Sequence, residues 1–151
     1  MLRVEKYAGR DFQGSSGVRS LSLPFELRQK KRFRTALEDG VEVAVFLPRG
    51  APLSDGDLLE ADDGTLIRII AAPERVLYAT APSAHALIRA AYHLGNRHTA
   101  VELGNGFLKL ETDPVLKEML LRLNLDVRED YLPFQPEQGA YNAGHSHGAT
   151  V

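Results

Sequence analysis

The chain has 151 residues, of which 44% are hydrophobic and 25% are charged, a size that suits one domain or two small ones. It has no cysteine, which excludes disulfides, thiolate catalysis and thiolate metal sites and leaves histidine and carboxylate as the strong ligands. The formal net charge of -2 argues against general nucleic-acid binding. The first ten residues lack the long apolar stretch of a signal peptide or a membrane-spanning helix, so we expect a cytoplasmic protein.

Residues 1–72 have the pattern of a small β-rich domain. Their apolar residues recur mostly at strand period, as in Val41–Leu47, and short turn sequences that contain glycine separate the runs. The pair Asp63-Gly64 lies between two apolar runs and predicts a β-hairpin. No helix is required before residue 72.

A basic segment lies inside this first domain. If the segment is extended, a period of two places four basic residues on one face: Arg28, Lys30, Arg32 and Arg34. The more common meaning of such a run is a solvated sheet face. The functional interpretation is attraction of an acidic protein partner, because the low overall charge disfavours nucleic acid.

Residues 73–132 show the order strand, helix, strand, strand, helix, strand. The strands are expected at 75–80, 99–103, 107–111 and 126–131, the first helix at 81–94, and the second helix after the N-cap Asp113. The first helix has a narrow apolar stripe, formed by Ala84, Leu87, Ile88 and Ala91. Gly95 is expected to take the left-handed conformation that ends this helix. The order is that of a ferredoxin-like domain, and the whole chain is therefore expected to be α+β.

Residues 133–151 change to Pro, Gln, Gly, Ala, Asn, Ser and His, with no apolar period that could hold them to a core. We expect a flexible tail. It carries His145 and His147, whose imidazoles could reach a metal ion held elsewhere.

The string His93–His98, which reads HLGNRH, resembles the UreE family of urease accessory proteins, which are nickel metallochaperones. The resemblance covers most of the chain. The β-rich first domain supports it with Leu47–Gly50 (LPRG) and Ser54–Asp57 (SDGD), and so does the tail that carries histidines.

The resemblance implies a homodimer in which His98 meets its symmetry mate and binds Ni(II). It also implies that residues 1–72 handle protein partners or peptides, and that residues 73–132 bind metal and form the dimer. The nickel cargo would then pass to apo-urease through a urease-activating GTPase. The chain would be a carrier and not an enzyme, with no nucleic-acid or membrane partner.

Ligand chemistry sets independent limits on the site. One imidazole on an ordinary loop binds a divalent ion weakly, and a two-fold axis supplies a second copy of His98. Nitrogen from His145 or His147 would complete a set that suits nickel and also Zn(II) or Cu(II). His93, in the last helical turn, is expected to orient the ligand through a hydrogen bond. One shared interface site predicts about one tight ion per dimer.

Two other classes of function are compatible with a metal site. A metallo-hydrolase would need an ion in a closed pocket beside a general base, and the sequence shows no such constellation. A metal-stabilised peptide-binding or adaptor module without metal delivery is the main alternative. Chelation separates it from a carrier, because only the adaptor would unfold when the metal is removed.

Overall fold

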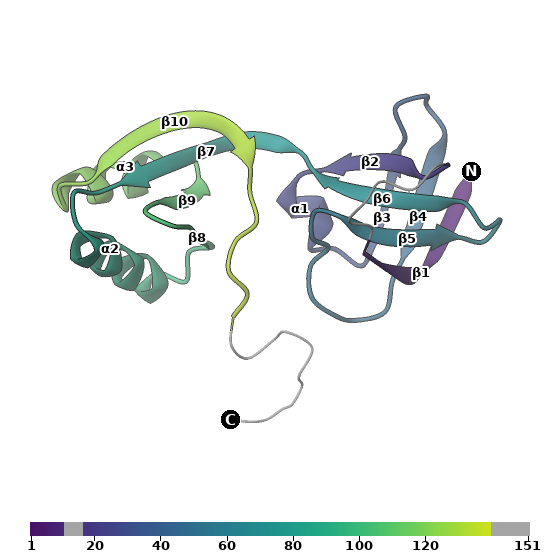
Figure 1. Ribbon diagram of the computed structural model, residues 1–151, viewed down its shortest axis with the longest axis horizontal. Coiled ribbons are helices and arrows are strands. Elements are labelled where there is room, and N and C mark those ends of the chain that lie inside the picture. The colour runs from purple at the N-terminus through teal and green to yellow at the C-terminus, as the bar shows by residue number, and fades with distance from the viewer. Residues whose placement is uncertain (11–16, 140–151) are drawn as a thin grey trace, which may run out of the picture. The chain divides into compact units, whose positions relative to one another are not determined.

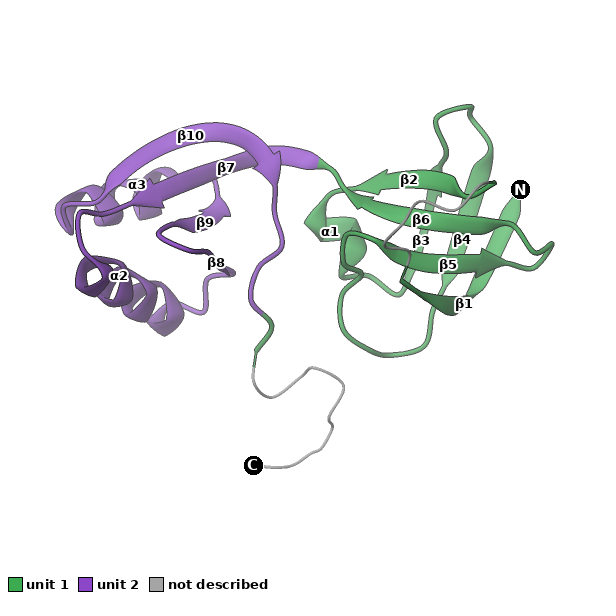
Figure 2. Ribbon diagram, in the orientation of Figure 1, with its two compact units in different colours: residues 1–72, 138–151 green, residues 73–137 purple. Residues whose placement is uncertain are grey.

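The computed structural model describes residues 1–10 and 17–139. It divides into two compact units, one with residues 1–72 together with the described residues 138–139, and the other with residues 73–137 (Figure 1, Figure 2). The chain passes from the first unit to the second at Ala72 and Pro73, where the apolar pattern of the sequence changes. No helix in the described residues has the length and apolar character needed to cross a lipid bilayer.

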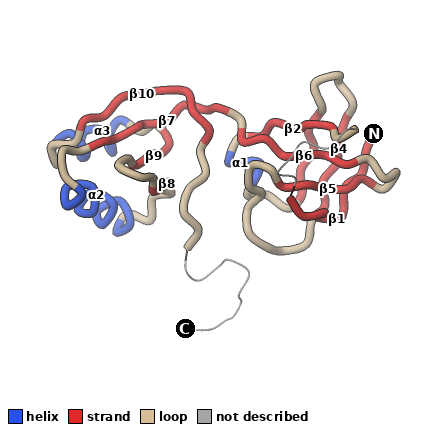
Figure 3. The backbone as a smooth tube through the Cα atoms, in the orientation of Figure 1, coloured by secondary structure: helices blue, strands red, loops and turns tan. Residues whose placement is uncertain are grey.

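The first unit is a six-stranded sheet with one short helix (Figure 3). Its elements are β1 (Leu2–Arg10), β2 (Arg19–Leu23), α1 (Phe25–Arg28), β3 (Arg32–Ala36), β4 (Glu42–Phe46), β5 (Asp57–Ala61) and β6 (Leu66–Ala71). The strand order is β2-β6-β5-β1-β4-β3, in which β1 with β4 and β2 with β6 are parallel pairs. Alternate residues of the central strands, among them Val4, Val45 and Ile67, are fully buried and form the core of this unit.

The hairpin predicted at Asp63-Gly64 is confirmed. Strands β5 and β6 pair antiparallel, and Gly64 takes a φ of 90°, which glycine adopts without the steric cost that a Cβ would add. The Asp63 carboxylate accepts a hydrogen bond from the backbone N–H of Thr65 at 2.9 Å and closes the turn.

The expectation that the basic segment is extended from its start is wrong, because α1 reverses the chain there. The backbone N–H groups of Leu27 and Arg28 both donate to the carbonyl of Pro24 at 3.1 Å. The helix turns Arg28 inward, where only 1% of it is exposed and its guanidinium donates to the carbonyls of Leu23 and Leu53 at 3.1 and 3.2 Å. Arg28 therefore stabilises the fold and is not part of a basic surface.

The second unit has the predicted ferredoxin-like order. Its elements are β7 (Pro73–Thr80), α2 (Ala84–Asn96), β8 (Glu102–Leu103), β9 (Leu108–Glu111), α3 (Pro114–Arg122) and β10 (Asp126–Pro133). The four strands are all antiparallel in the order β10-β7-β9-β8. Both helices pack on the sheet face that carries Leu77 and Ala79. Asp113 caps α3 as predicted, since its carboxylate accepts from the N–H groups of Val115 and Leu116 at 2.8 and 3.0 Å.

The structure differs from the sequence expectation at the start of the tail. Strand β10 continues to Pro133, and the next residue, Phe134, is fully buried. Residues 133–137, which we call the strap, then run from the β10 edge of the sheet to the β8 edge, where the N–H of Glu137 donates to the carbonyl of Val101 at 2.7 Å. One buried aromatic ring and backbone pairing fix this segment, and neither produces an apolar period in the sequence.

Lys109 holds the strap on the face of the sheet opposite to the helices. Its neighbours in β9 pack into the helix-side core, so its own side chain points to the other face. There its ammonium donates to the carbonyl of Pro133 at 2.7 Å and forms an ion pair with Glu102 at 3.3 Å. Glu102 also accepts from the backbone N–H of Gln135 at 2.8 Å. The strap is therefore fixed at three points.

Candidate metal site

His98 lies in the turn that ends α2, and a defined hydrogen-bond pattern positions it. The N–H of Thr99 donates to the carbonyl of Leu94 at 3.2 Å, and the N–H of His98 donates to the carbonyl of Gly95 at 3.0 Å. This pair of bonds is a Schellman motif, in which one residue past the helix must be left-handed. That residue is His98, with a φ of 55°.

The expectation that Gly95 takes the left-handed conformation is therefore wrong. Helix α2 continues through Gly95 to Asn96. Leu94 is the last fully buried residue of the helix, and its carbonyl accepts the outer bond of the motif. The left-handed position consequently falls at His98, four residues beyond Leu94.

The backbone conformation of His98 is unfavourable for a residue with a side chain. A left-handed conformation costs an L-residue about 1–2 kcal/mol, although Asn, Asp and His occur there more often than other residues. Glycine avoids most of this cost, so helix termination alone does not explain a histidine. The side chain of His98 is exposed, and strain held at an exposed imidazole is a reason to look for a functional role.

Within one copy of the described chain, no group of metal-binding side chains forms around His98. In residues 1–10 and 17–139, no three histidine, aspartate or glutamate side chains come together in a group that could hold a metal ion. His145 and His147 lie outside the described residues. A tight site at His98 therefore needs donors from a second copy of the chain or from residues beyond 139.

His93 lies in the last turns of α2 and is half-buried. Its ring contacts the ring of Tyr92 edge to face, with centroids 5.4 Å apart. His93 belongs to the helix, whereas His98 lies in the turn after the helix ends. Its expected role as the residue that orients the metal ligand stays a prediction.

An exposed apolar face on α2 was not predicted from the sequence. The sequence pattern places Ile88 in the core stripe, but 65% of Ile88 is exposed, as is 65% of Tyr92 one turn later. The buried stripe runs instead through Leu87, Ala90 and Leu94. Two large apolar residues at i and i+4 outside the core stripe were the signal that could have revealed this face.

Gly95 continues the same exposed face toward the His98 turn. It is helical, and a Cβ built on it would meet no atom within 4 Å. The single chain therefore has neither a conformational nor a steric need for glycine here. We refer to Ile88, Tyr92 and Gly95 together as the α2 face.

The predicted basic face is smaller than expected because it lacks Arg28. Lys30, Arg32 and Arg34 are exposed, and β3 is an edge strand of its sheet. The guanidinium of Arg32 lies 5.9 Å from the centre of the Phe46 ring. The surface is thus a short positive patch on one edge of the first unit.

Comparison with known proteins identifies the family. The model of the UreE urease accessory protein N-terminal domain matches residues 4–72, and the model of the C-terminal domain matches residues 74–150. The urease accessory protein UreE of Burkholderia vietnamiensis is 59% identical over 129 residues, which are 85% of this chain and 64% of that protein. The UreE proteins of Burkholderia orbicola and Paraburkholderia xenovorans are each 58% identical over 85% of this chain, and over 63% and 57% of their own lengths.

The chain thus spans less than two thirds of the length of these relatives. The relatives are named as accessory proteins of urease, which supports the expectation that this chain is not itself an enzyme. Both domain models match in the expected order, and together they cover nearly the whole sequence. The chain belongs to the UreE family of urease accessory proteins.

Proposed function

We propose that this protein is a nickel metallochaperone that acts in urease maturation in the cytoplasm. Two copies form a homodimer, and the two His98 imidazoles bind one Ni(II) on the dimer axis. The nickel is cargo, which the protein passes toward apo-urease with the help of a urease-activating GTPase. Zn(II) and Cu(II) suit the same nitrogen ligands.

The conformation of His98 is the observation that carries the proposal. An exposed imidazole sits at a position where glycine would fit with less strain, directly after a helix whose end is fixed by two hydrogen bonds. The turn therefore presents the imidazole in a restricted range of directions. Preorganisation of this kind favours metal binding by two symmetry-related residues, because little conformational entropy is lost when the ion binds.

The α2 face supports a dimer contact beside His98. Ile88 and Tyr92 offer apolar surface, and Gly95 lets another backbone approach the helix closely. A two-fold contact through this face would bring the two α2 helix ends near each other, and with them the two His98 turns. Burial of this surface would also remove the exposure of Ile88 and Tyr92 to water.

The strap supports a role for the tail histidines at the same ion. Glu137 is bonded to Val101, which is three residues from His98, and three residues span at most about 11 Å. His145 is eight residues after Glu137, a length of chain that spans up to about 28 Å. A tether of this length gives His145 and His147 a high effective concentration near His98.

The exposed basic patch of Lys30, Arg32 and Arg34 is proposed to attract an acidic surface of a partner protein. Its charge would mainly raise the rate of association, and salt would weaken the effect. Charge reversal at Arg32 and Arg34 should slow association with the GTPase or with apo-urease at low salt. Unchanged association rates would reduce the patch to an ordinary solvated surface.

Nickel titration calorimetry on four proteins tests the proposal. The parent should bind about one tight nickel per dimer. His98→Ala should lose the tight component, whereas a chain that ends after Gln138 keeps the strap and should only bind more weakly. His85→Ala is the matched control, because His85 is an exposed histidine in the first turn of the same helix. Equal losses from His98→Ala and from the truncation would contradict the ranking of the ligands.

Chelation and acid provide a second test. A chelator should remove the nickel and leave both units folded, since each has its own apolar core. Acid should weaken nickel binding, because imidazole must be neutral to bind a metal ion. Unfolding of the protein on chelation would instead support an adaptor whose metal is structural.

A further inference from the structure

The first unit contains a cavity of about 470 Å³ far from the histidines in sequence. It is bounded by the end of β1, the residue before β3, the loop between β4 and β5, the start of β5, and Gln138. Tyr7, Arg10, Lys31 and Asp57 contribute polar groups to its lining, and the loop 47–54 forms much of its wall.

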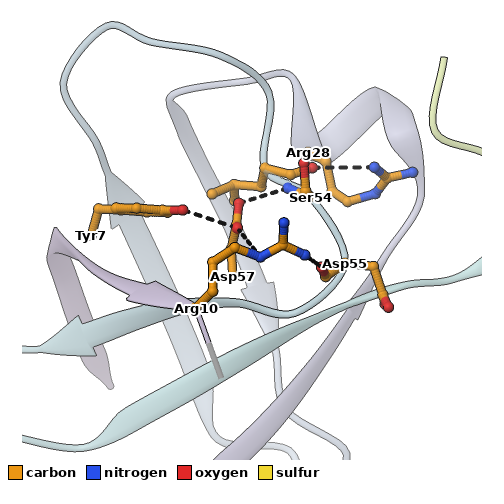
Figure 4. Close-up of polar contacts among 7 residues, drawn as sticks. Tyr7, Arg10, Arg28, Ser54, Asp55 and Asp57 are labelled. Carbon is orange, nitrogen blue, oxygen red and sulfur yellow. Dashed lines mark hydrogen bonds and ion pairs between the residues drawn. The ribbon is translucent and has the colours of Figure 1, made fainter. Parts of the chain in front are cut away.

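Backbone hydrogen bonds hold the loop 47–54 in place. The N–H of Leu47 donates to the carbonyl of Lys31, and the N–H of Leu53 donates to the carbonyl of Arg28, each at 2.8 Å. The buried Arg28 guanidinium also donates to the carbonyl of Leu53 at 3.2 Å (Figure 4). Pro48 and Pro52 restrict the backbone between these anchors. The cavity wall is therefore preformed.

The carboxylate in the cavity already has partners within the protein. Asp57 is 5% exposed and accepts hydrogen bonds from the Tyr7 hydroxyl at 2.9 Å and from the N–H of Ser54 at 2.7 Å (Figure 4). The Arg10 guanidinium lies 3.6 Å from it. Burial and the hydrogen bond to Asp57 raise the pKa of Tyr7, so the hydroxyl stays a donor to this carboxylate. Asp57 consequently adds little repulsion toward an anionic ligand.

Lys31 supplies a positive charge at the cavity, and its ammonium has N–H groups left for a ligand. Its ammonium donates to the carbonyl of Ala51 at 2.6 Å, which engages one of its three N–H groups. Partial burial lowers the pKa of Lys31, because water no longer fully solvates the ammonium. A carboxylate bound to the remaining N–H groups would compensate for this loss of solvation. Arg49, exposed on the loop, adds a second positive charge at the rim.

We propose that this cavity binds an acidic peptide segment of a partner protein, with a carboxylate on Lys31 and a neighbouring apolar side chain against Leu47, Pro48 and Pro52. The positive rim and the apolar loop together match a segment in which acidic and apolar residues alternate. This inference rests on the partner-binding role proposed for the first unit and names the place where the partner would bind. It does not depend on nickel binding, which the proposed function assigns to the second unit.

The test measures binding of a fluorescent peptide, in which aspartate alternates with leucine, to the full chain by fluorescence anisotropy. Lys31→Met keeps the length of the side chain and removes its charge, and should weaken binding about tenfold or more, the effect of one charge-assisted hydrogen bond. Lys6→Met is the matched control, because the exposed Lys6 belongs to the same unit but lies outside both the cavity lining and the basic patch. It should bind the peptide like the parent.

A second peptide and an NMR measurement test whether the carboxylates of the peptide bind in the cavity. An asparagine–leucine peptide should bind more weakly than the aspartate peptide, and amide resonances of Ala51 and Ser54 should shift when the aspartate peptide is added. Equal losses in Lys6→Met and Lys31→Met, or no binding to the parent, would overturn the proposal. Both variants should bind nickel like the parent, so failure of the peptide site is distinguishable from failure of the metallochaperone role.

Discussion

His98 and Asn124 occupy equivalent positions at the ends of the two helices of the second unit. Each is the left-handed residue of a Schellman motif, with φ values of 55° and 66°. After α3, the N–H of Leu125 donates to the carbonyl of Leu120 at 3.1 Å, as the corresponding pair does after α2. Asparagine is a usual residue at this position and histidine a less usual one, so the comparison isolates what the imidazole adds.

Glycine at position 98 should separate stability from metal binding. His98→Gly removes a conformational cost of about 1–2 kcal/mol, and the greater freedom of glycine in the unfolded chain offsets about 0.5–1 kcal/mol of it. The variant should therefore be at least as stable as the parent in urea denaturation, and should lose tight nickel binding in calorimetry. Asn124→Gly, the control, should keep the nickel. Tight nickel binding in His98→Gly would show that the imidazole is not a ligand.

The α2 face should control the oligomeric state. Ile88→Glu would place a charge in the proposed contact and should convert the dimer to a monomer in analytical ultracentrifugation, with loss of tight nickel binding. Val115→Glu is the matched control, because Val115 is a similarly exposed apolar residue, 64% exposed, on α3. It should leave the dimer unchanged. A dimer that survives Ile88→Glu would place the contact elsewhere.

The strap should loosen when Lys109 loses its charge. Lys109→Met removes the charged donor to the carbonyl of Pro133, a hydrogen bond worth about 1.5–3 kcal/mol. Hydrogen exchange at the amides of Gln135 and Glu137 should become faster, and the tail should contribute less to nickel affinity. Lys117→Met serves as the control, because Lys117 pairs with the exposed Glu129. Unchanged exchange in Lys109→Met would mean that Phe134 alone holds the strap.

Removal of the Arg28 guanidinium should destabilise the first unit. Arg28→Met leaves the buried carbonyl of Leu53 without this donor, at a cost of about 1–3 kcal/mol, whereas the carbonyl of Leu23 still accepts from the N–H of Ala72. Urea denaturation should show a lower midpoint for Arg28→Met. Arg32→Met, on the exposed strand β3, should change the stability by no more than about 0.5 kcal/mol. Equal stability of the two variants in urea would show that Arg28 does not stabilise the fold and would contradict this account.

The regular elements could be predicted from the sequence because their signals are local. The Asp113 cap and the Asp63-Gly64 turn each depend on side-chain and backbone bonds within a few residues, and both are confirmed. The alternation of strands and helices likewise predicted the order of the second unit. Such features need no knowledge of distant parts of the chain.

The structure differs from the sequence predictions where contacts between residues far apart in the chain determine which side chains are buried. Arg28 reads as a surface residue by its charge, yet the carbonyl of Leu53, 25 residues away, accepts its hydrogen bond. Phe134 is a single apolar residue in a polar segment, and its burial depends on the strap crossing a sheet face. Ile88 fits the helical period of the core stripe, but the stripe is narrower than the pattern suggests.

The candidate site itself was only partly accessible from sequence. The string His93–His98 identified His98, but the left-handed backbone became visible only in the structure, because Leu94 and not Gly95 sets the end of the helix. The exposure of the α2 face is likewise a product of packing. Both observations support the proposal that a second copy of the chain supplies a ligand beside His98.

Native mass spectrometry of the parent and of His98→Gly, each with nickel, tests the central claim most directly, because it counts chains and ions in the same measurement. The account predicts a parent dimer that carries about one nickel ion and a His98→Gly protein that carries none at the same nickel concentration. A nickel ion bound tightly to the parent monomer, or retained by the His98→Gly dimer, would contradict it.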